Sequence, residues 1–186
     1  MTISTTLVFG LDPGFASFGF SLVRLSSTGH AAVEELGVIE TQKASKKHAV
    51  YASDDTLHRA RDIYKRLKPL AARCSAMAAE SMSFPRSSSV ANKMGVSWGL
   101  IASLSSEFGL PVVQFSPQKL KEFITNDKAA SKEAMEAAVK DRLGVDFANK
   151  LHILRKTARE HPVDATAAAL CSVESEVVKA LLRGPR

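Results

Sequence analysis

Four side chains that can bind a metal ion or move a proton stand at three separate places in the sequence. Asp12 follows a short apolar run, Glu80 ends another, and His161 and Asp164 stand three residues apart near the end of the chain. Their oxygen and nitrogen atoms are ligands suited to Mg²⁺ or Mn²⁺. Because a cluster of like charges is costly without a cation, we treat these four residues as a candidate metal site.

Each of these residues also has a simpler explanation when it is taken alone. Asp12 can be a turn residue held by its own backbone contacts, and Asp164 an acid favoured at the N-terminus of a helix. Glu80 can be a surface acid, and His161 only the residue that pairs with the start of a helix. The metal-site interpretation depends on the four residues occurring together at two strand ends and one helix start.

The first forty residues have the pattern of three strands. Residues 6–11 form an apolar run, residues 18–25 alternate apolar and polar side chains, and residues 31–40 resume an extended pattern. The turn signals Asp12-Pro-Gly14 and Ser26-Ser-Thr-Gly29 separate them. The expected result is an antiparallel meander.

The rest of the chain has the pattern of alternating helices and strands. Apolar residues at spacings of three and four predict a helix over about 54–71. Residues 75–80 are rich in alanine, but their place between two helices favours a buried strand. The elements expected next are a helix over 88–108, a strand over 111–115, helices that open at Ser116-Pro117 and at Ser131, and a last helix from Val163 to about Leu182.

This order of elements predicts one α/β domain over residues 1–186. Its mixed five-stranded sheet has three antiparallel strands followed by parallel ones, and helices flank it. Strand ends in such a sheet border the crevice where ligands commonly bind. Asp12 and Glu80 are expected at that crevice, and His161 and Asp164 share one face of a first helical turn.

Composition narrows the class of protein. The chain has 186 residues, of which 45% are hydrophobic and 24% charged, which excludes a disordered tail, a collagenous chain and a small disulfide-stapled module. The net charge of +6 is compatible with a polyanionic partner. Cys74 and Cys171 lack metal-ligand or redox spacing, which indicates buried thiols in a reducing compartment. Without a membrane span or signal features near Met1, we expect a cytoplasmic protein with no membrane partner.

Several motifs together resemble the RuvC-type Holliday junction resolvases. They are Leu11-Asp-Pro-Gly14 with Gly19, Gly37-Val-Ile39, Glu80 followed by Phe84 and Asn92, His161-Pro-Val-Asp-Ala165, and a segment that carries Lys121 and Lys132 eleven residues apart. Each motif alone is a weak signal. Their ordered combination, from about residue 6 to residue 178, is specific.

The resemblance implies an RNase H-like fold and a homodimeric endonuclease. Such an enzyme cuts two opposed strands of a four-way DNA junction as paired symmetric nicks, and some members act on other branched DNA. Asp12, Glu80, His161 and Asp164 match the metal-binding catalytic positions of the family, where His or Asp is accepted at position 161. Two Mg²⁺ or Mn²⁺ ions per active site are expected there, with Asp12 between them, and no nucleotide cofactor.

The resemblance also implies residues that contact DNA. Lys121 and Lys132 match a lysine-bearing region that offsets the charge of the scissile phosphate or grips the adjacent backbone; their simpler explanation is a solvated helix face. Arg86, Lys93, Lys119 and Lys128 are dispersed basic residues that can follow the junction arms, and their simpler explanation is ordinary surface charge. The full expected set is Phe84, Arg86, Lys93, Lys119, Lys121, Lys128 and Lys132. Phe84 stands one place later than the aromatic residue of the family, and stacking on an unpaired base competes with a core role.

The helix over 88–108 carries an apolar stripe. Its members are Val90, Met94, Ser97, Trp98, Ile101 and Leu104. Part of the stripe must pack on the sheet, and the remainder is expected to form a subunit interface, because a two-fold dimer matches a junction with two-fold symmetry. Trp98 is more often a core residue on general grounds.

Two other functions are weighed against the nuclease. One is a non-catalytic architectural protein that binds junctions, but a pure binder would gain affinity by losing the four acidic and metal-binding residues. The other is an ATPase of the actin and sugar-kinase superfamily, which also begins with an acidic strand and turn. Such enzymes need two domains and a second glycine-rich phosphate loop, which the sequence lacks.

Overall fold

The computed structural model of the chain describes residues 3–43, 51–82 and 87–184. One five-stranded sheet has the order β3-β2-β1-β4-β5. The strands are β1 (Thr5–Asp12), β2 (Ser17–Ser26), β3 (Ala31–Glu40), β4 (Ala76–Glu80) and β5 (Val112–Phe115). The first three pair antiparallel, and β4 runs parallel to both β1 and β5. The predicted mixed sheet is confirmed, including the alanine-rich strand β4.

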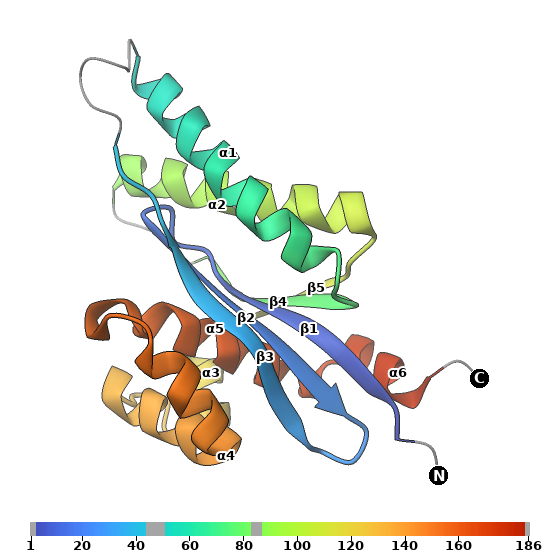
Figure 1. Cartoon of the computed structure of the whole chain (residues 1–186). Helices are drawn as coiled ribbons and strands as arrows, with labels where there is room; N and C mark the ends of the chain where they lie inside the picture. The colour runs from blue at the N-terminus through green and yellow to red at the C-terminus, as the bar shows by residue number, and fades with distance from the viewer. Residues whose placement is uncertain (1–2, 44–50, 83–86, 185–186) are drawn as a thin grey trace.

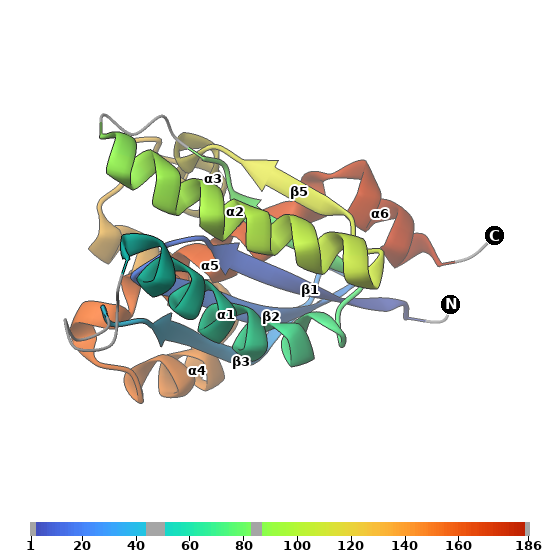
Figure 2. The same cartoon turned by 90° about the horizontal axis from the view of Figure 1, so that it is seen from above.

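Helices cover both faces of the sheet, as Figures 1 and 2 show. On one face lie α1 (Ala52–Ala71) and α2 (Ser88–Phe108). On the other lie α3 (Pro117–Thr125), α4 (Lys132–His152), α5 (Glu160–Cys171) and α6 (Glu176–Arg183), with short 3₁₀ turns at Lys156–Ala158 and Ser172–Glu174. The predicted caps are confirmed, since the Ser116 and Ser131 side chains accept hydrogen bonds from the first turns of α3 and α4.

The two faces of the sheet are packed with side chains of different size. On the α1–α2 face the core contains large residues such as Phe9, Phe18 and Leu67. On the other face α5 buries a series of alanines that includes Ala165 and Ala168. Small side chains let α5 lie close to β1 and β2, against which it packs.

The prediction of one continuous last helix from Val163 to Leu182 is wrong. The helix ends at Cys171, and α6 begins afresh at Glu176. Ser175 has an extended backbone, and its side chain accepts a hydrogen bond from the Val178 backbone N–H, which makes it the N-cap of a new helix. The start also differs, because α5 begins at Glu160 and Pro162 lies in its first turn, where no backbone N–H is needed.

Both cysteines are free thiols. Cys171 is buried and Cys74 half-buried, and burial raises the pKa of each thiol to about 12. Within the described part of the chain, no helix combines the length and apolar character that a membrane crossing requires. The single domain over 1–186 and the cytoplasmic location stay predictions.

Candidate active site at the carboxyl ends of β1 and β4

The topology gathers the four residues predicted as a metal site. Asp12 and Glu80 are the last residues of β1 and β4, which are parallel neighbours and therefore end at the same edge of the sheet. His161 lies in the first turn of α5, which packs on β1 and β2, and Asp164 lies about one turn further along the same helix. His161 Nδ1 lies 2.7 Å from Asp12 Oδ2, at hydrogen-bond distance. We call these four residues the acid edge.

The carboxylates of the acid edge act on one another. Burial, together with the charge of Asp12, raises the pKa of Glu80 to about 7. Burial also raises the pKa of Asp164 to about 7, and the charges of Asp12 and Glu80 add to this effect. The hydrogen bond to Asp12 raises the pKa of His161 above its ordinary value. Negative charge is thus concentrated here beyond what the surroundings neutralise, which is typical of functional sites.

The donor atoms of the acid edge fit a hard divalent cation in their chemistry. Three carboxylates and one imidazole supply ligands of the kind that Mg²⁺ and Mn²⁺ prefer, and a cation would remove the repulsion between the acids. Among the described residues, however, no three His, Cys, Asp or Glu side chains are placed to hold one ion as they stand. An ion held by three of these side chains would therefore require the side chains to rearrange.

Both lysines singled out in the sequence lie beside the acid edge. Lys121, in α3, lowers the pKa of Glu80 through its charge. Lys132, the first residue of α4, does the same to Asp164. Two positive charges thus flank the acids from neighbouring helices.

Glu160 is a charged neighbour that the sequence analysis missed. It forms an ion pair with Lys132, and its Oε1 lies 3.8 Å from His161 Nε2. Its charge adds to the rise in the pKa of Asp164. The only signal in the sequence is its place immediately before His161, which says nothing of the pairing with Lys132.

Three more lysines expected to contact DNA lie in α3, in the turn between α3 and α4, and in α2. Lys119 Nζ lies 2.8 Å from Glu174 Oε2, and Lys128 Nζ lies 3.5 Å from a carboxylate oxygen of Glu122. These exposed pairs contribute little to stability and can open when a phosphate approaches. Lys93 lies in the first half of α2.

The remaining expected DNA contacts, Phe84 and Arg86, lie outside the described residues. Asp127 is a turn residue. Its Oδ1 accepts a hydrogen bond of 2.8 Å from the backbone N–H of Ala129.

Part of the apolar stripe of α2 is buried against the sheet, and part of it is exposed. Ser97, Ile101 and Leu104 are buried. Trp98 is half-buried and packs against the same core. Val90, near the start of the helix, is 47% exposed. The sheet therefore covers only part of the stripe, as predicted.

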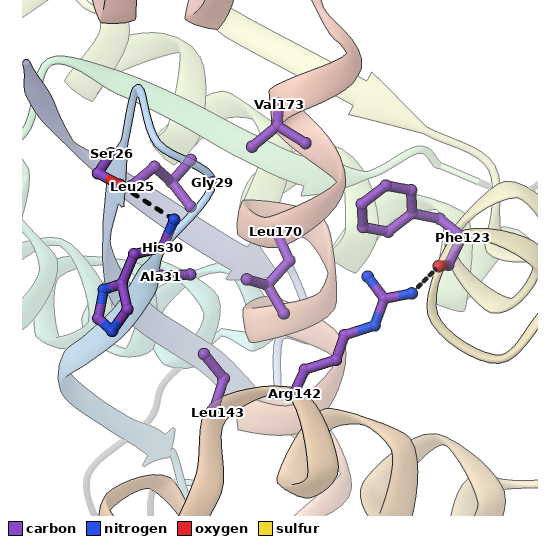
Figure 3. Close-up of a pocket in the computed structure, with 10 residues that line it drawn as sticks. All are labelled: Leu25, Ser26, Gly29, His30, Ala31, Phe123, Arg142, Leu143, Leu170 and Val173. Atoms are coloured by element: carbon purple, nitrogen blue, oxygen red, sulfur yellow. Dashed lines mark hydrogen bonds between the residues drawn. The ribbon is translucent and has the colours of Figure 1, made fainter.

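A pocket of about 470 Å³ lies at the opposite end of the sheet, beside the turn between β2 and β3 (Figure 3). It is lined by Leu25, Ser26, Gly29, His30, Ala31, Phe123, Arg142, Leu143, Leu170 and Val173. The Arg142 guanidinium donates to the backbone carbonyls of Phe123 and Ile124 and stacks on the Phe123 ring. We call this the turn pocket. None of its lining residues is a carboxylate, and its one guanidinium already has partners.

The sheet order, the helices on both faces and the acids at one edge define an RNase H-like α/β protein. The family model described as crossover junction endodeoxyribonuclease RuvC matches residues 8–172. The chain belongs to this RuvC family.

Curated relatives and solved structures agree with this assignment. Two crossover junction endodeoxyribonucleases RuvC are each 28% identical to this chain. The one from Moorella thermoacetica aligns over 167 residues, 89% of either chain, and the one from Saccharophagus degradans over 183 residues, 97% of this chain and 94% of that protein. The RuvC structure from Thermus thermophilus has a TM-score of 0.70 and 26% identity, and the match covers 90% of this chain and 93% of that one. The yeast mitochondrial Holliday junction resolvase, at 10% identity and a TM-score of 0.63, shares the fold.

Proposed function

We propose that this chain resolves four-way (Holliday) DNA junctions by paired symmetric nicks, and that the acid edge is its catalytic site. One observation carries the assignment of the site. In a chain of the RuvC family, Asp12 at the end of β1 lies close enough to Glu80 of β4 and Asp164 of α5 for its charge to add to the rise that burial causes in the pKa of both. Holding unneutralised acids together weakens a fold, which favours a functional reason for their presence.

Asp12 is the common member of the acid edge. Its charge affects both Glu80 and Asp164, and its Oδ2 contacts His161. We therefore assign Asp12 as the central residue that would hold the cations, together with Glu80 and Asp164, and with His161 as a further ligand. Two Mg²⁺ or Mn²⁺ ions held there would supply activation of the attacking water and stabilisation of the leaving 3′-oxygen.

Lys121 and Lys132 provide the positive charge for the phosphate that is cut. Both act electrostatically on the acid edge, so a phosphate that reaches these acids also meets the two lysines. In the DNA-free chain Lys132 pairs with Glu160. A DNA phosphate would take the place of Glu160 as its partner, and Lys119, Lys128 and Lys93 would hold the flanking backbone.

The proposed partners are branched DNA and a second copy of this chain. Paired nicks in a two-fold junction require two active sites related by two-fold symmetry. The exposed part of the α2 stripe, with Val90 at its start, supports α2 as the interface. A dimer mass for the purified chain in light scattering is the expected observation.

The test is cleavage of a synthetic four-way junction by the purified chain. With Mg²⁺ or Mn²⁺ we expect nicks at paired positions, whereas Asp12→Asn lowers the cutting rate by about 10³-fold while junction binding persists. Flaps, forks and plain duplex serve as comparison substrates. Cutting by Asp12→Asn at the wild-type rate would show that the acid edge is not the site, and binding without cutting under any divalent cation would favour the architectural alternative.

A further inference from the structure

The first turn of α5 lies directly over a glycine of β2. Gly19 pairs with Asp12 in the β1–β2 register, so it stands beside the central acid. A Cβ at position 19 would lie 2.4 Å from the backbone O of His161 and 2.8 Å from the Cβ of His161. Side chains do not occur at such distances. The backbone of His161 can therefore lie where it does only because residue 19 has no side chain.

A second glycine supports the next turn of the same helix. Gly10 lies two residues before Asp12 in β1, and a Cβ there would lie 2.0 Å from the backbone O of Ala165, the neighbour of Asp164. The helix thus touches the sheet backbone at two points, one beside His161 and one beside Asp164. By contrast, a Cβ at Gly99 of α2 would meet nothing within 4 Å.

We propose that Gly19 is a positioning residue for the acid edge: it sets how close the first turn of α5 comes to Asp12. The proposal rests on the function proposed above. The contact at stake is the 2.7 Å between His161 Nδ1 and Asp12 Oδ2, which a displacement of the helix by about 1 Å would take beyond hydrogen-bond range. Asp164, one turn along the same helix, would move with it. Misplacement of this size by itself lowers enzymatic rates by about 10²-fold.

The opposing explanation is that Gly19 serves only the packing of α5. On that explanation Gly19→Ala costs stability and nothing else. A matched control is available on the other face of the sheet, because Ile63 of α1 is fully buried in the core that α5 does not share. Substituting Ile63 with Val or Ala lowers Tm by graded amounts, and the variant whose Tm equals that of Gly19→Ala is chosen.

The first measurement needs neither metal nor DNA. The chain has five histidines, so the imidazole ¹⁵N signals of His161 are assigned by comparison with His161→Gln and followed by NMR at one fixed pH. We expect Gly19→Ala to move them toward their positions in Asp12→Ala, in which the partner of His161 is removed, and the Ile63 control to leave them in place. Unchanged His161 signals in folded Gly19→Ala overturn the proposal, whatever the outcome for Asp12→Asn in the cutting assay.

The second measurement is the affinity for Mn²⁺ alone, by electron paramagnetic resonance titration. We expect Gly19→Ala to weaken Mn²⁺ binding about tenfold and cutting about 10²-fold, while the control keeps both. Equal losses in the control, or none in Gly19→Ala, contradict the proposal. If Gly19→Ala does not fold even in trimethylamine N-oxide, which strengthens folding, the glycine is required for folding rather than for positioning, and the proposal is equally wrong.

Discussion

The two ends of α5 border two regions of the molecule whose side chains have different chemistry. At its start lies the acid edge, where burial and the charge of Asp12 raise the pKa of Glu80 and of Asp164 to about 7. In its last turn Leu170 lines the turn pocket of about 470 Å³. The walls of this pocket are largely apolar, and its one arginine, Arg142, already donates hydrogen bonds to backbone carbonyls. The presence of a pocket is thus a poor indicator of the active site. A cluster of acidic side chains with raised pKa values is a better indicator.

The largest expected effect is a difference in the rate of junction cutting between variants of the acid edge and of the turn pocket. Asp164→Asn keeps the size of the side chain but removes a cation ligand, and we expect a loss of about 10³-fold in the rate of junction cutting. His30→Ala removes an exposed side chain that lines the turn pocket, and we expect a change of less than about twofold. Rates are measured on one four-way junction under the same Mg²⁺ concentration. If His30→Ala lowers the cutting rate as much as Asp164→Asn does, the turn pocket is as important for cutting as the acid edge, and the comparison is wrong.

Much of the acid edge could be predicted from the sequence. Asp12 and Glu80 end apolar runs, and the parallel pairing of two strands places such residues at one edge whatever the details of the loops. His161 and Asp164 are separated by one helical turn, so one prediction of a helix start placed both. The family resemblance then supplied the two lysines, which no periodicity distinguishes from a solvated helix face.

What the sequence did not show depends on contacts between distant segments. The ion pair between Glu160 and Lys132 joins two helices whose relative placement has no local signal. The break at Ser172–Ser175 has no signal in the apolar pattern, because alanine-rich and apolar residues continue on both sides of it. It is marked only by Ser175, which is the N-cap of α6. In the sequence Gly10 is an ordinary strand glycine and Gly19 is part of the family resemblance, but the close contact of both with α5 appears only in three dimensions.

The next effect concerns pH and is expected only at the acid edge. Glu80 and Asp164, whose pKa values are raised to about 7, must lose their protons to bind a cation. For one such group the ionised fraction rises about 25-fold between pH 5.5 and 7.5, so Mn²⁺ affinity should rise by at least that factor. Wild type and His30→Ala are titrated with Mn²⁺ across this range, and both should show the same rise. An affinity independent of pH would mean that these acids do not bind the ion.

The smallest effect concerns stability, and its sign is expected to differ between the two ends of α5. The pKa of Asp164 is raised from 3.8 to about 7 on folding, so the unfolded chain releases this proton first and stability falls as pH rises from about 4 to 7. Above pH 7 the full penalty is present, with an upper limit of about 4 kcal/mol that solvent access reduces to about 1–2 kcal/mol. At pH 8 in the presence of a chelator, Asp164→Asn should therefore raise the free energy of unfolding by about 1 kcal/mol, and the gain should vanish below pH 4.

The control for this last effect lies on the same helix. Leu170→Ala removes buried apolar contacts at the turn pocket, and we expect a loss of about 2 kcal/mol or more at either pH. Urea unfolding of the three chains measures both effects. Saturating Mg²⁺ should raise the stability of the wild type and leave Asp164→Asn nearly unchanged, because the cation stabilises the folded state only where its ligands are intact. If Asp164→Asn is instead less stable than the wild type at pH 8 without divalent ions, Asp164 contributes to the fold, and the inference from its raised pKa to a catalytic role is wrong.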